Sequence, residues 1–128
     1  MNIHESAEDY LECILMLQKK NGTVRSIDIV RELDYSKPSV SVAMKRLREN
    51  GYIEMDPDGF ISLLPQGEAI ASKIYGRHQL LTEYLMQLGV SPDVAAEDAC
   101  KIEHDLSSES YERIKAVTLR NRKTSSEG

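Results

Sequence analysis

Aromatic residues, cysteines and long apolar runs are scarce in this chain. Its 128 residues include no tryptophan, one phenylalanine and two cysteines. No apolar run approaches the roughly 20 residues that a helix needs to cross a bilayer, and the first stretch, MNIHESAEDY, is polar and acidic. Because Trp and Phe are so scarce, the core must be mainly aliphatic. Because no segment is apolar enough to cross a membrane, we expect a cytoplasmic protein.

The two cysteines argue against a small protein held together by disulfides. Cys13 and Cys100 form no C-x-x-C pair and do not suggest a disulfide framework. In a reducing compartment such free thiols can serve as metal ligands.

Positive charge is also in deficit, with a formal net charge of −5. This argues against a general nucleic-acid binder, because phosphate contacts need local positive charge. Between Ser36 and Arg48, however, the chain carries Lys37, Lys45, Arg46 and Arg48 and no acidic residue. A basic element in an acidic protein indicates a focused nucleic-acid contact.

The first half of the sequence has the element order of a DNA-binding domain. Periodicity and capping residues predict helices in SAEDYLECILMLQKKNG, SIDIVRELD and KPSVSVAMKRLREN, the last capped by Ser36 with Pro38 in its first turn. YIEM and FISLL flank the turn sequence DPDG and predict a two-stranded hairpin. This order is typical of a winged helix-turn-helix, and an ordinary three-helix bundle is the alternative. The apolar positions expected to be buried are Tyr10, Leu11, Ile14, Leu15, Leu17, Ile27, Val30, Leu33, Val40, Met44 and Leu47.

The second half predicts three more helices, at about 68–88, 91–106 and 107–119. The apolar segment LLTEYLMQLGV exceeds what a domain of roughly 60 residues can bury alone, which predicts a dimer. The fold class is thus mainly α, and three parts are expected: a winged helix-turn-helix domain at 1–64, a helical domain at 65–119, and a disordered tail at 120–128.

The third helix has the composition of a recognition helix. The N-terminal residues of such a helix face base edges in the major groove. Serine hydroxyls pair with several bases, and a proline can contact a thymine methyl group. Basic residues further along suit phosphates. Each residue alone is better explained as part of a solvated helix face, but the cluster predicts DNA contacts by Ser36, Lys37, Pro38, Ser39, Ser41, Lys45 and Arg48.

Several side chains with metal-ligand chemistry recur at helical spacing. Cys100, Glu103 and His104 are spaced i, i+3 and i+4, so on a helix all three project from one face. Asp9 and Glu12 form an i, i+3 pair, and one histidine lies in an apolar stretch of the long helix. Taken singly, these residues suit a packed thiol, a solvated acid pair and a core histidine. Six such residues on three helices are hard to explain one by one, so spacing leaves a metal site open beside these readings. Its candidate ligands are Asp9, Glu12, His78, Cys100, Glu103 and His104.

Four stretches resemble a known family: SAEDYLECILML, KPSVSVAMKRLRENGYIE, LLPQGEAIASKIYGRHQLL and CKIEHDLS. They are similar to the diphtheria-toxin-repressor family of metal-dependent transcriptional regulators, over about Ser6 to Ile114. The resemblance implies a winged helix followed by a dimerisation and metal-binding domain. It also implies a homodimer on a palindromic DNA operator and one or two divalent ions per subunit. The length matches the two-domain manganese branch, without the third domain of the iron repressors.

The same resemblance assigns roles to the candidate ligands. Asp9 and Glu12 stand where the manganese branch has its N-terminal ligands, His78 matches the helical histidine, and Glu103 and His104 match the family's Glu-His pair.

Cys100 departs from the manganese branch, which has glutamate there. The iron repressors have cysteine at that position but methionine in place of Asp9, and their second site needs acidic and histidine ligands where this chain has Thr82 and Ala96. The ligand set is thus a hybrid. Its oxygens and imidazoles suit Mn(II) first and Fe(II) second, since one thiolate does not make the site soft.

The sequence therefore predicts a homodimeric, metal-activated DNA-binding regulator, expected by resemblance to repress metal-uptake genes. Metal would tie the winged helix to the dimerisation domain and set two recognition helices about one DNA turn, roughly 34 Å, or a multiple apart. The alternative is a metal-independent winged-helix regulator that senses a small ligand or redox state through Cys100. An enzyme, either a non-haem iron oxygenase or a Cys-His nucleophile, is not expected, because no segment resembles a substrate pocket.

Overall fold

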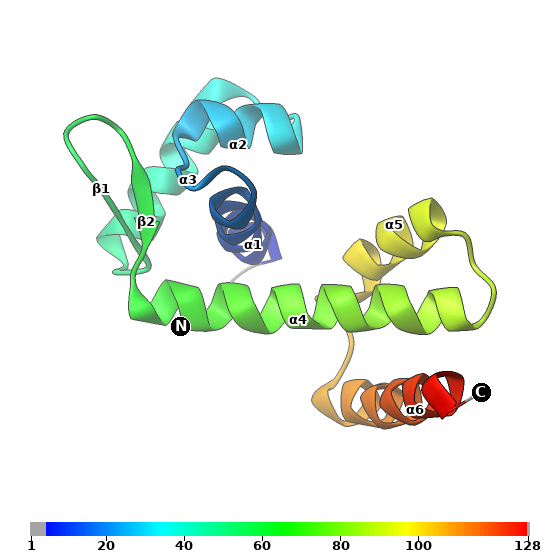
Figure 1. Cartoon of the computed structure of the whole chain (residues 1–128). Coiled ribbons are helices and arrows are strands. Elements are labelled where there is room, and N and C mark those ends of the chain that lie inside the picture. The colour runs from blue at the N-terminus through cyan, green and yellow to red at the C-terminus, as the bar shows by residue number, and fades with distance from the viewer. Residues whose placement is uncertain (1–4, 128) are drawn as a thin grey trace. The chain divides into compact units, whose positions relative to one another are not determined.

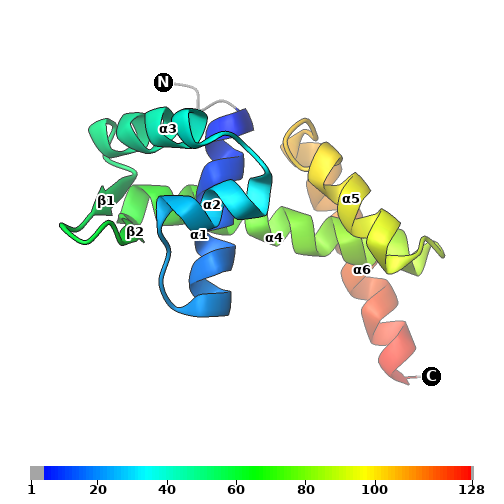
Figure 2. The ribbon, with the colours of Figure 1, turned by 90° about the horizontal axis from the view of Figure 1, so that it is seen from above.

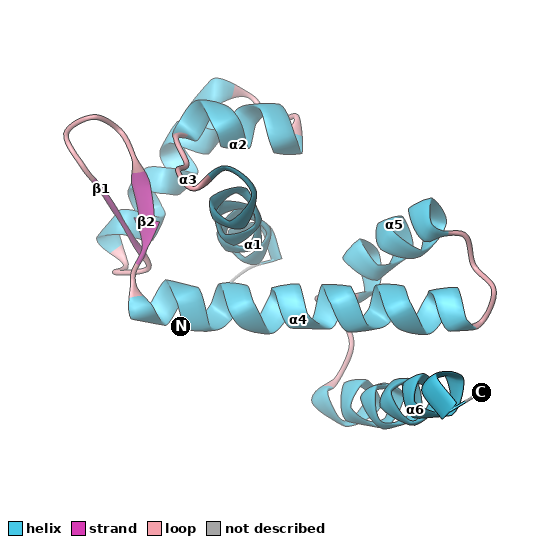
Figure 3. Ribbon diagram, viewed as in Figure 1, coloured by secondary structure: helices cyan, strands magenta, loops and turns pink. Residues whose placement is uncertain are grey.

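The computed structural model describes residues 5–127, and the side chains of residues 6–123 (Figure 1). Outside one hairpin, the regular structure of this part of the chain is helical (Figure 3). The chain forms two compact units that meet between Lys73 and Ile74, inside one long helix. The elements in order are α1 (Glu5–Asn21), α2 (Ser26–Leu33), α3 (Lys37–Glu49), β1 (Ile53–Met55), β2 (Ile61–Leu63), α4 (Pro65–Gln87), α5 (Pro92–Ile102) and α6 (Ser108–Glu127).

The first unit is a three-helix core closed by the hairpin, as the winged-helix prediction requires. Helix α2 packs against α1 and α3, β2 packs against α1, and β1 against α3. The N–H of Ile61 donates to the carbonyl of Val24 (2.8 Å), which attaches the hairpin to the α1–α2 connection. The face predicted for α2 is only half-buried, and Ile29 is its buried residue. The other apolar positions expected in the core are buried: Tyr10, Leu11, Ile14, Leu15, Leu17, Val40, Met44 and Leu47.

A short turn joins α2 to α3. Asp34 ends α2 in the left-handed conformation (φ 57°), with its N–H bonded to the carbonyl of Val30 (3.0 Å). Ser36 then caps α3, because its hydroxyl oxygen accepts a hydrogen bond from the N–H of Ser39 (3.2 Å). The N-cap predicted at Ser36 is confirmed, and it fixes the direction in which α3 leaves the turn.

The hairpin is antiparallel, with Ile53 opposite Leu63 and Met55 opposite Ile61. Its turn is organised by Asp56, whose carboxylate accepts hydrogen bonds from the N–H groups of Asp58 and Phe60, both at 2.9 Å. The predicted hairpin turn at DPDG is therefore confirmed.

The second unit consists of α5, α6 and the part of α4 that begins at Ile74. In Figure 1, α5 and α6 lie on opposite sides of this part of α4. Helix α5 buries the small residues Ala95 and Ala99, while α4 buries Leu80 and Leu81. Among the described residues, no helix combines the length and apolarity needed to cross a membrane.

Three helix ends differ from the sequence prediction. Helix α4 begins at Pro65 rather than near residue 68, since proline fits the first helical turn. Helix α5 ends at Ile102 and does not continue through 106. Helix α6 continues to Glu127, past the end expected near 119.

The extension of α6 has a physical cause. The tail expected to be disordered carries Asn121, which donates to the side-chain carbonyl of Gln87 (3.2 Å), and Arg122, which pairs with Glu83. These bonds attach the polar end of α6 to α4. Residue 128, the last of the expected tail, lies outside the described residues.

Candidate metal centre and nucleic-acid interface

Glu103 occupies the C-cap of α5, and its side chain is fully buried at 0 % exposure. Arg77 holds this segment in place, because its guanidinium donates to the main-chain carbonyls of Glu103 (3.0 Å) and Leu106 (2.8 Å). The same guanidinium lies over the ring of Tyr111, 4.8 Å from the ring centroid. Arg77 thus satisfies the carbonyls left open where α5 ends, which explains why the helix stops before the predicted residue.

Two imidazoles approach the buried carboxylate. Nδ1 of His78 lies 2.9 Å from Oε2 of Glu103, and Nε2 of His104 lies 3.4 Å from Oε1. Among the described residues, Oε1 accepts no hydrogen bond despite being fully buried. A buried carboxylate oxygen without a donor is costly unless a cation compensates it.

This cluster fits a divalent first-row ion. Carboxylate oxygens and imidazole nitrogens are ligands that Mn(II), Fe(II) and Zn(II) accept. Two predicted ligands, His78 and His104, therefore each lie next to the third, Glu103, in the second unit.

The other three predicted ligands have different environments. Glu12 is buried and Asp9 half-buried on α1, in the first unit. Cys100 is exposed on α5, whereas Glu103 is fully buried. The expectation that Cys100, Glu103 and His104 share one helix face assumed a longer α5. The ligand role of Cys100 stays a prediction.

Cys13 is not a candidate ligand. Burial raises the pKa of the Cys13 thiol to about 12, with a further contribution from Glu32, Glu12 and Asp9. A thiol that stays protonated at neutral pH binds metal poorly.

Sequence reasoning missed the part that Arg77 plays. Its signal was present, since an arginine directly before His78 in a mostly apolar stretch needs a buried partner. Which carbonyls it would bond could not be inferred, because they lie 26 and 29 residues away in the chain.

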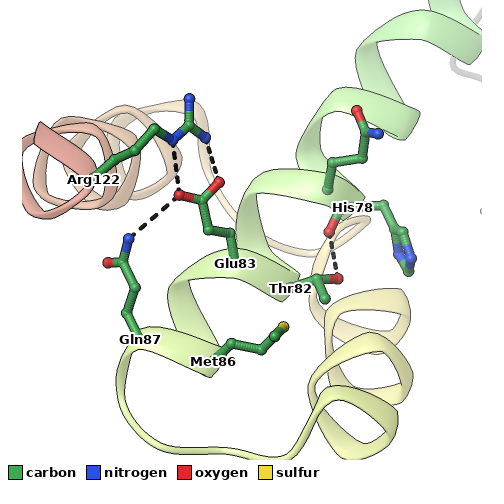
Figure 4. A pocket seen from close by; sticks show the side chains of 7 residues that line it. His78, Thr82, Glu83, Met86, Gln87 and Arg122 are labelled. Carbon is green, nitrogen blue, oxygen red and sulfur yellow. Dashed lines mark hydrogen bonds and ion pairs between the residues drawn. The ribbon is translucent and has the colours of Figure 1, made fainter. Parts of the chain in front are cut away.

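A different polar cluster joins α4 to α6. Arg122 pairs with Glu83, with 2.9 Å between Nε and Oε2, and this hydrogen bond lowers the pKa of the Glu83 carboxyl. Gln87 donates to the carbonyl of Thr118 (3.1 Å). Figure 4 shows the Glu83 side chain directed toward Arg122 and the ring of His78 directed away from it. His78 lines the same pocket as Glu83, Gln87 and Arg122, but its ring takes no part in their hydrogen bonds.

Helix α3 carries the predicted DNA-binding residues on its solvent side. Seen from above, it lies along an edge of the first unit, with its end next to the hairpin (Figure 2). Its buried face consists of Val40, Met44 and Leu47. All seven predicted residues are exposed: Ser36, Lys37, Pro38, Ser39, Ser41, Lys45 and Arg48.

Sequence reasoning also missed an apolar feature of this surface. Val42 is 51 % exposed, although the helix has a separate buried face. It lines a shallow hollow together with Pro38, Ser39, Ala43 and Arg46. Position 42 lies four residues after Pro38, a helical spacing that would have revealed the shared face.

Both halves of the chain match the models of known protein families. Residues 2–60 match the iron-dependent repressor, N-terminal DNA-binding domain. Residues 64–126 match the iron-dependent repressor, metal-binding and dimerisation domain.

Individual relatives agree. The chain is 38 % identical over 114 residues to the transcriptional regulator MntR of Salmonella typhimurium, covering 89 % of this chain and 73 % of that protein. It is 34 % identical over 113 residues to an uncharacterized HTH-type transcriptional regulator of Methanocaldococcus jannaschii. This match covers 87 % of this chain and 90 % of that protein.

Solved structures give the same fold. The manganese regulator SloR superposes with a TM-score of 0.75 at 28 % identity, over 91 % of this chain and 54 % of that one. A manganese-dependent transcriptional repressor in complex with manganese superposes with a TM-score of 0.81 at 27 % sequence identity. The match covers 88 % of this chain and 52 % of that one. The chain therefore spans about half the length of these solved structures.

These matches confirm the predicted family, the fold class and the expectation that the chain is not an enzyme. With a DNA-binding domain in its first half and a metal-binding and dimerisation domain in its second, the chain belongs to the iron-dependent repressor family of metal-dependent DNA-binding transcriptional regulators.

Proposed function

We propose that this protein is a homodimeric, metal-activated repressor that binds a palindromic DNA operator in the cytoplasm and controls metal-uptake genes. The observation that carries the proposal is the buried Glu103 carboxylate, which has two imidazoles beside it and an oxygen that accepts no hydrogen bond among the described residues. The DNA-binding part rests on the exposed basic face of α3, which has no acidic residue in its first turn.

Glu103, His78 and His104 are the proposed core of the metal site. Their chemistry supports this role, since one carboxylate and two imidazoles can bind a divalent ion while other positions stay open. Arg77 would keep the ligands in place by bonding the main chain of the same turn.

Asp9, Glu12 and Cys100 are proposed as further ligands on the sequence pattern and the family resemblance. One or two ions per subunit would accommodate the six residues. The acidic pair lies on α1, which packs against both α2 and α3. Metal binding at α1 would therefore restrict the recognition helix, and this is the proposed route from metal to DNA affinity.

Mn(II) is the proposed physiological ion, with Fe(II) as the second candidate. Two relatives support manganese by name: SloR is a manganese regulator, and another solved repressor contains manganese. The ligand set supports the same choice, because hard carboxylate oxygens outnumber the single thiolate.

The proposed dimer forms through the second unit. The three helices of this unit and the turn after α4 expose large apolar side chains that a monomer would leave in water: Met86, Leu88, Val94 and Leu119. Sedimentation at micromolar concentration should show a dimer with and without metal. A monomer under both conditions would contradict this part of the proposal.

A metal panel tests the function as a whole. Operator sequences are first selected from a random DNA pool with the full chain and Mn(II). Binding is then measured with Mn(II), Fe(II), Zn(II), Mg(II) or a chelator. We expect tight binding with Mn(II) or Fe(II) and at least about tenfold weaker binding with the chelator, a coupling typical of allosteric proteins. Equal binding in all conditions would instead support the metal-independent regulator.

A further inference from the structure

We propose that Tyr10 and Tyr35 form a ring contact that transmits metal binding on α1 to the start of helix α3. The inference rests on the proposed function and deepens it, because it names side chains that carry the regulation. Neither tyrosine is a candidate metal ligand or a predicted DNA contact. Both belong to the first unit, and in the sequence Tyr10 stands between the proposed ligands Asp9 and Glu12.

The two tyrosine rings meet edge to face. Their centroids lie 5.7 Å apart and their planes are inclined by 72°, an arrangement that aromatic pairs favour. Tyr10 is buried on α1, so the surrounding core holds its ring in place. Tyr35 is 40 % exposed and lies in the turn between α2 and α3. The contact therefore joins a fixed ring on α1 to a half-exposed ring on the turn.

Tyr35 stands between two residues whose backbone positions are fixed. Before it, Asp34 adopts the left-handed conformation, and its N–H donates to the carbonyl of Val30. After it, Ser36 caps α3 by accepting a hydrogen bond from the N–H of Ser39. Because both neighbours are held, a displacement of Tyr35 is passed on to Ser36 and to the first turn of α3.

On α1, Tyr10 belongs to the same helical turn as the proposed ligands. Asp9 precedes it directly, and Glu12 follows two residues later. Residues one and two positions apart on a helix project in different directions, so the ring does not compete with the carboxylates for an ion. A divalent ion held by the two carboxylates would fix this turn of α1, and with it the position of the Tyr10 ring.

Burial alone does not explain the Tyr35 ring. The core of the first unit contains aliphatic side chains such as Leu11, Ile14 and Ile29, which are fully buried. An aromatic ring that stays half-exposed contributes less to folding than these residues do. Its defined geometry against one buried partner is what a positioning role requires.

The test measures the coupling ratio, which is the operator affinity with saturating Mn(II) divided by the affinity in chelator. Operators are selected with the full chain and Mn(II). Tyr35→Ala should reduce this ratio about fivefold, since an aromatic pair stabilises its arrangement by about that factor. The loss should lie in the Mn(II) measurement, with the affinity in chelator unchanged. By linkage, Mn(II) affinity should fall by the same factor in the DNA complex and stay constant in the free protein.

Further variants separate positioning from packing. Tyr35→Phe keeps the ring and should retain the wild-type ratio. Tyr10→Leu should reduce the ratio as Tyr35→Ala does, and the double variant should reduce it no further, because both changes remove the same contact. Met16→Ala is the matched control, since Met16 lies on α1 with 38 % exposure, and it should leave the ratio unchanged. Urea unfolding checks that each variant is folded; if Tyr10→Leu is not, the two Tyr35 variants still decide.

The outcomes separate the inference from the proposed function. A wild-type coupling ratio in Tyr35→Ala overturns the inference while the proposed function stands. An equal loss of affinity with Mn(II) and in chelator also overturns it, because Tyr35 would then act on DNA directly. A loss in Tyr35→Phe as large as in Tyr35→Ala overturns it in favour of the hydroxyl group. A wild-type protein without coupling overturns the metal-dependent function itself, and the inference with it.

Discussion

The proposed DNA contacts and the proposed core of the metal site are placed in opposite ways. The proposed DNA contacts of the first unit lie on the solvent side of α3 and come from one continuous segment. The proposed core of the metal site, in the second unit, gathers around the fully buried carboxylate of Glu103 and comes from α4 and the end of α5. An exposed face tolerates substitution one residue at a time, whereas a buried cluster depends on every partner. Substitutions in the two regions should therefore have different consequences.

The largest effect is expected at Glu103. Glu103→Gln should weaken Mn(II) binding by about 100-fold or more and abolish metal-dependent DNA binding, because the central charged ligand is lost. The variant should be no less stable than the wild type in chelator, since the amide removes a buried charge that lacks full compensation. Calorimetric titration and urea unfolding measure the two effects.

The matched control is Glu97→Gln, on an exposed position of α5. It should change neither quantity. If Glu103→Gln retained metal-dependent DNA binding, the cluster would not be the regulatory site, and the contrast between the two units would disappear.

Arg77 should show an intermediate effect. Arg77→Gln removes hydrogen bonds to the carbonyls of Glu103 and Leu106, so the turn that carries two proposed ligands becomes loose. We expect Mn(II) affinity to fall about tenfold, as for other residues that orient ligands. Hydrogen exchange should quicken at residues 103–106. Unchanged exchange there would show that Arg77 does not hold the turn.

On the exposed helix α3, Lys45→Ala should act on DNA alone. We expect weaker binding to every sequence and a salt slope reduced by about one, because one phosphate contact is lost. Ser41→Ala should instead relax the preference between sequences. Metal affinity and stability should match the wild type in both variants. An intact salt slope after Lys45→Ala would remove Lys45 from the DNA interface.

A Co(II) spectrum tests whether Cys100 is one of the metal ligands. If the thiolate binds the ion, Co(II) should give a sulfur-to-metal charge-transfer band in the near ultraviolet. The band should vanish in Cys100→Ser and persist in Cys13→Ser, whose protonated, buried thiol is not a ligand. A reduced, metal-responsive protein without this band would leave an oxygen and nitrogen site without Cys100.

The smallest effect is expected at Arg122. Its hydrogen bond lowers the pKa of Glu83, so the pair stabilises the protein while Glu83 is ionised, and this stabilisation is lost as the pH falls through the pKa of Glu83 in the folded protein. Arg122→Gln should therefore lower stability slightly at neutral pH and not at strongly acidic pH. Thermal unfolding at both pH values measures the difference, which is small because the pair is largely solvated. A constant difference at all pH values would exclude the ion pair as its cause.

The sequence determined the first unit almost completely. Helical spacing, the Ser36 cap and the DPDG turn are local signals, and the elements they predict lie within one or two residues of the observed ones. The exposure of the predicted DNA-binding residues was predictable for the same reason, since residues of one helix need no tertiary contact to share a face. The apolar hollow around Val42 and the burial of Ile29 on α2 were missed.

Tertiary structure decided the second unit. The end of α5, the burial of Glu103 and the extension of α6 all depend on partners more than twenty residues away: Arg77 for the first two, Glu83 and Gln87 for the third. A sequence pattern identifies which residues can bind a metal, because that depends on chemical type. Which of them meet depends on where a helix stops, and an interaction between distant segments sets that point.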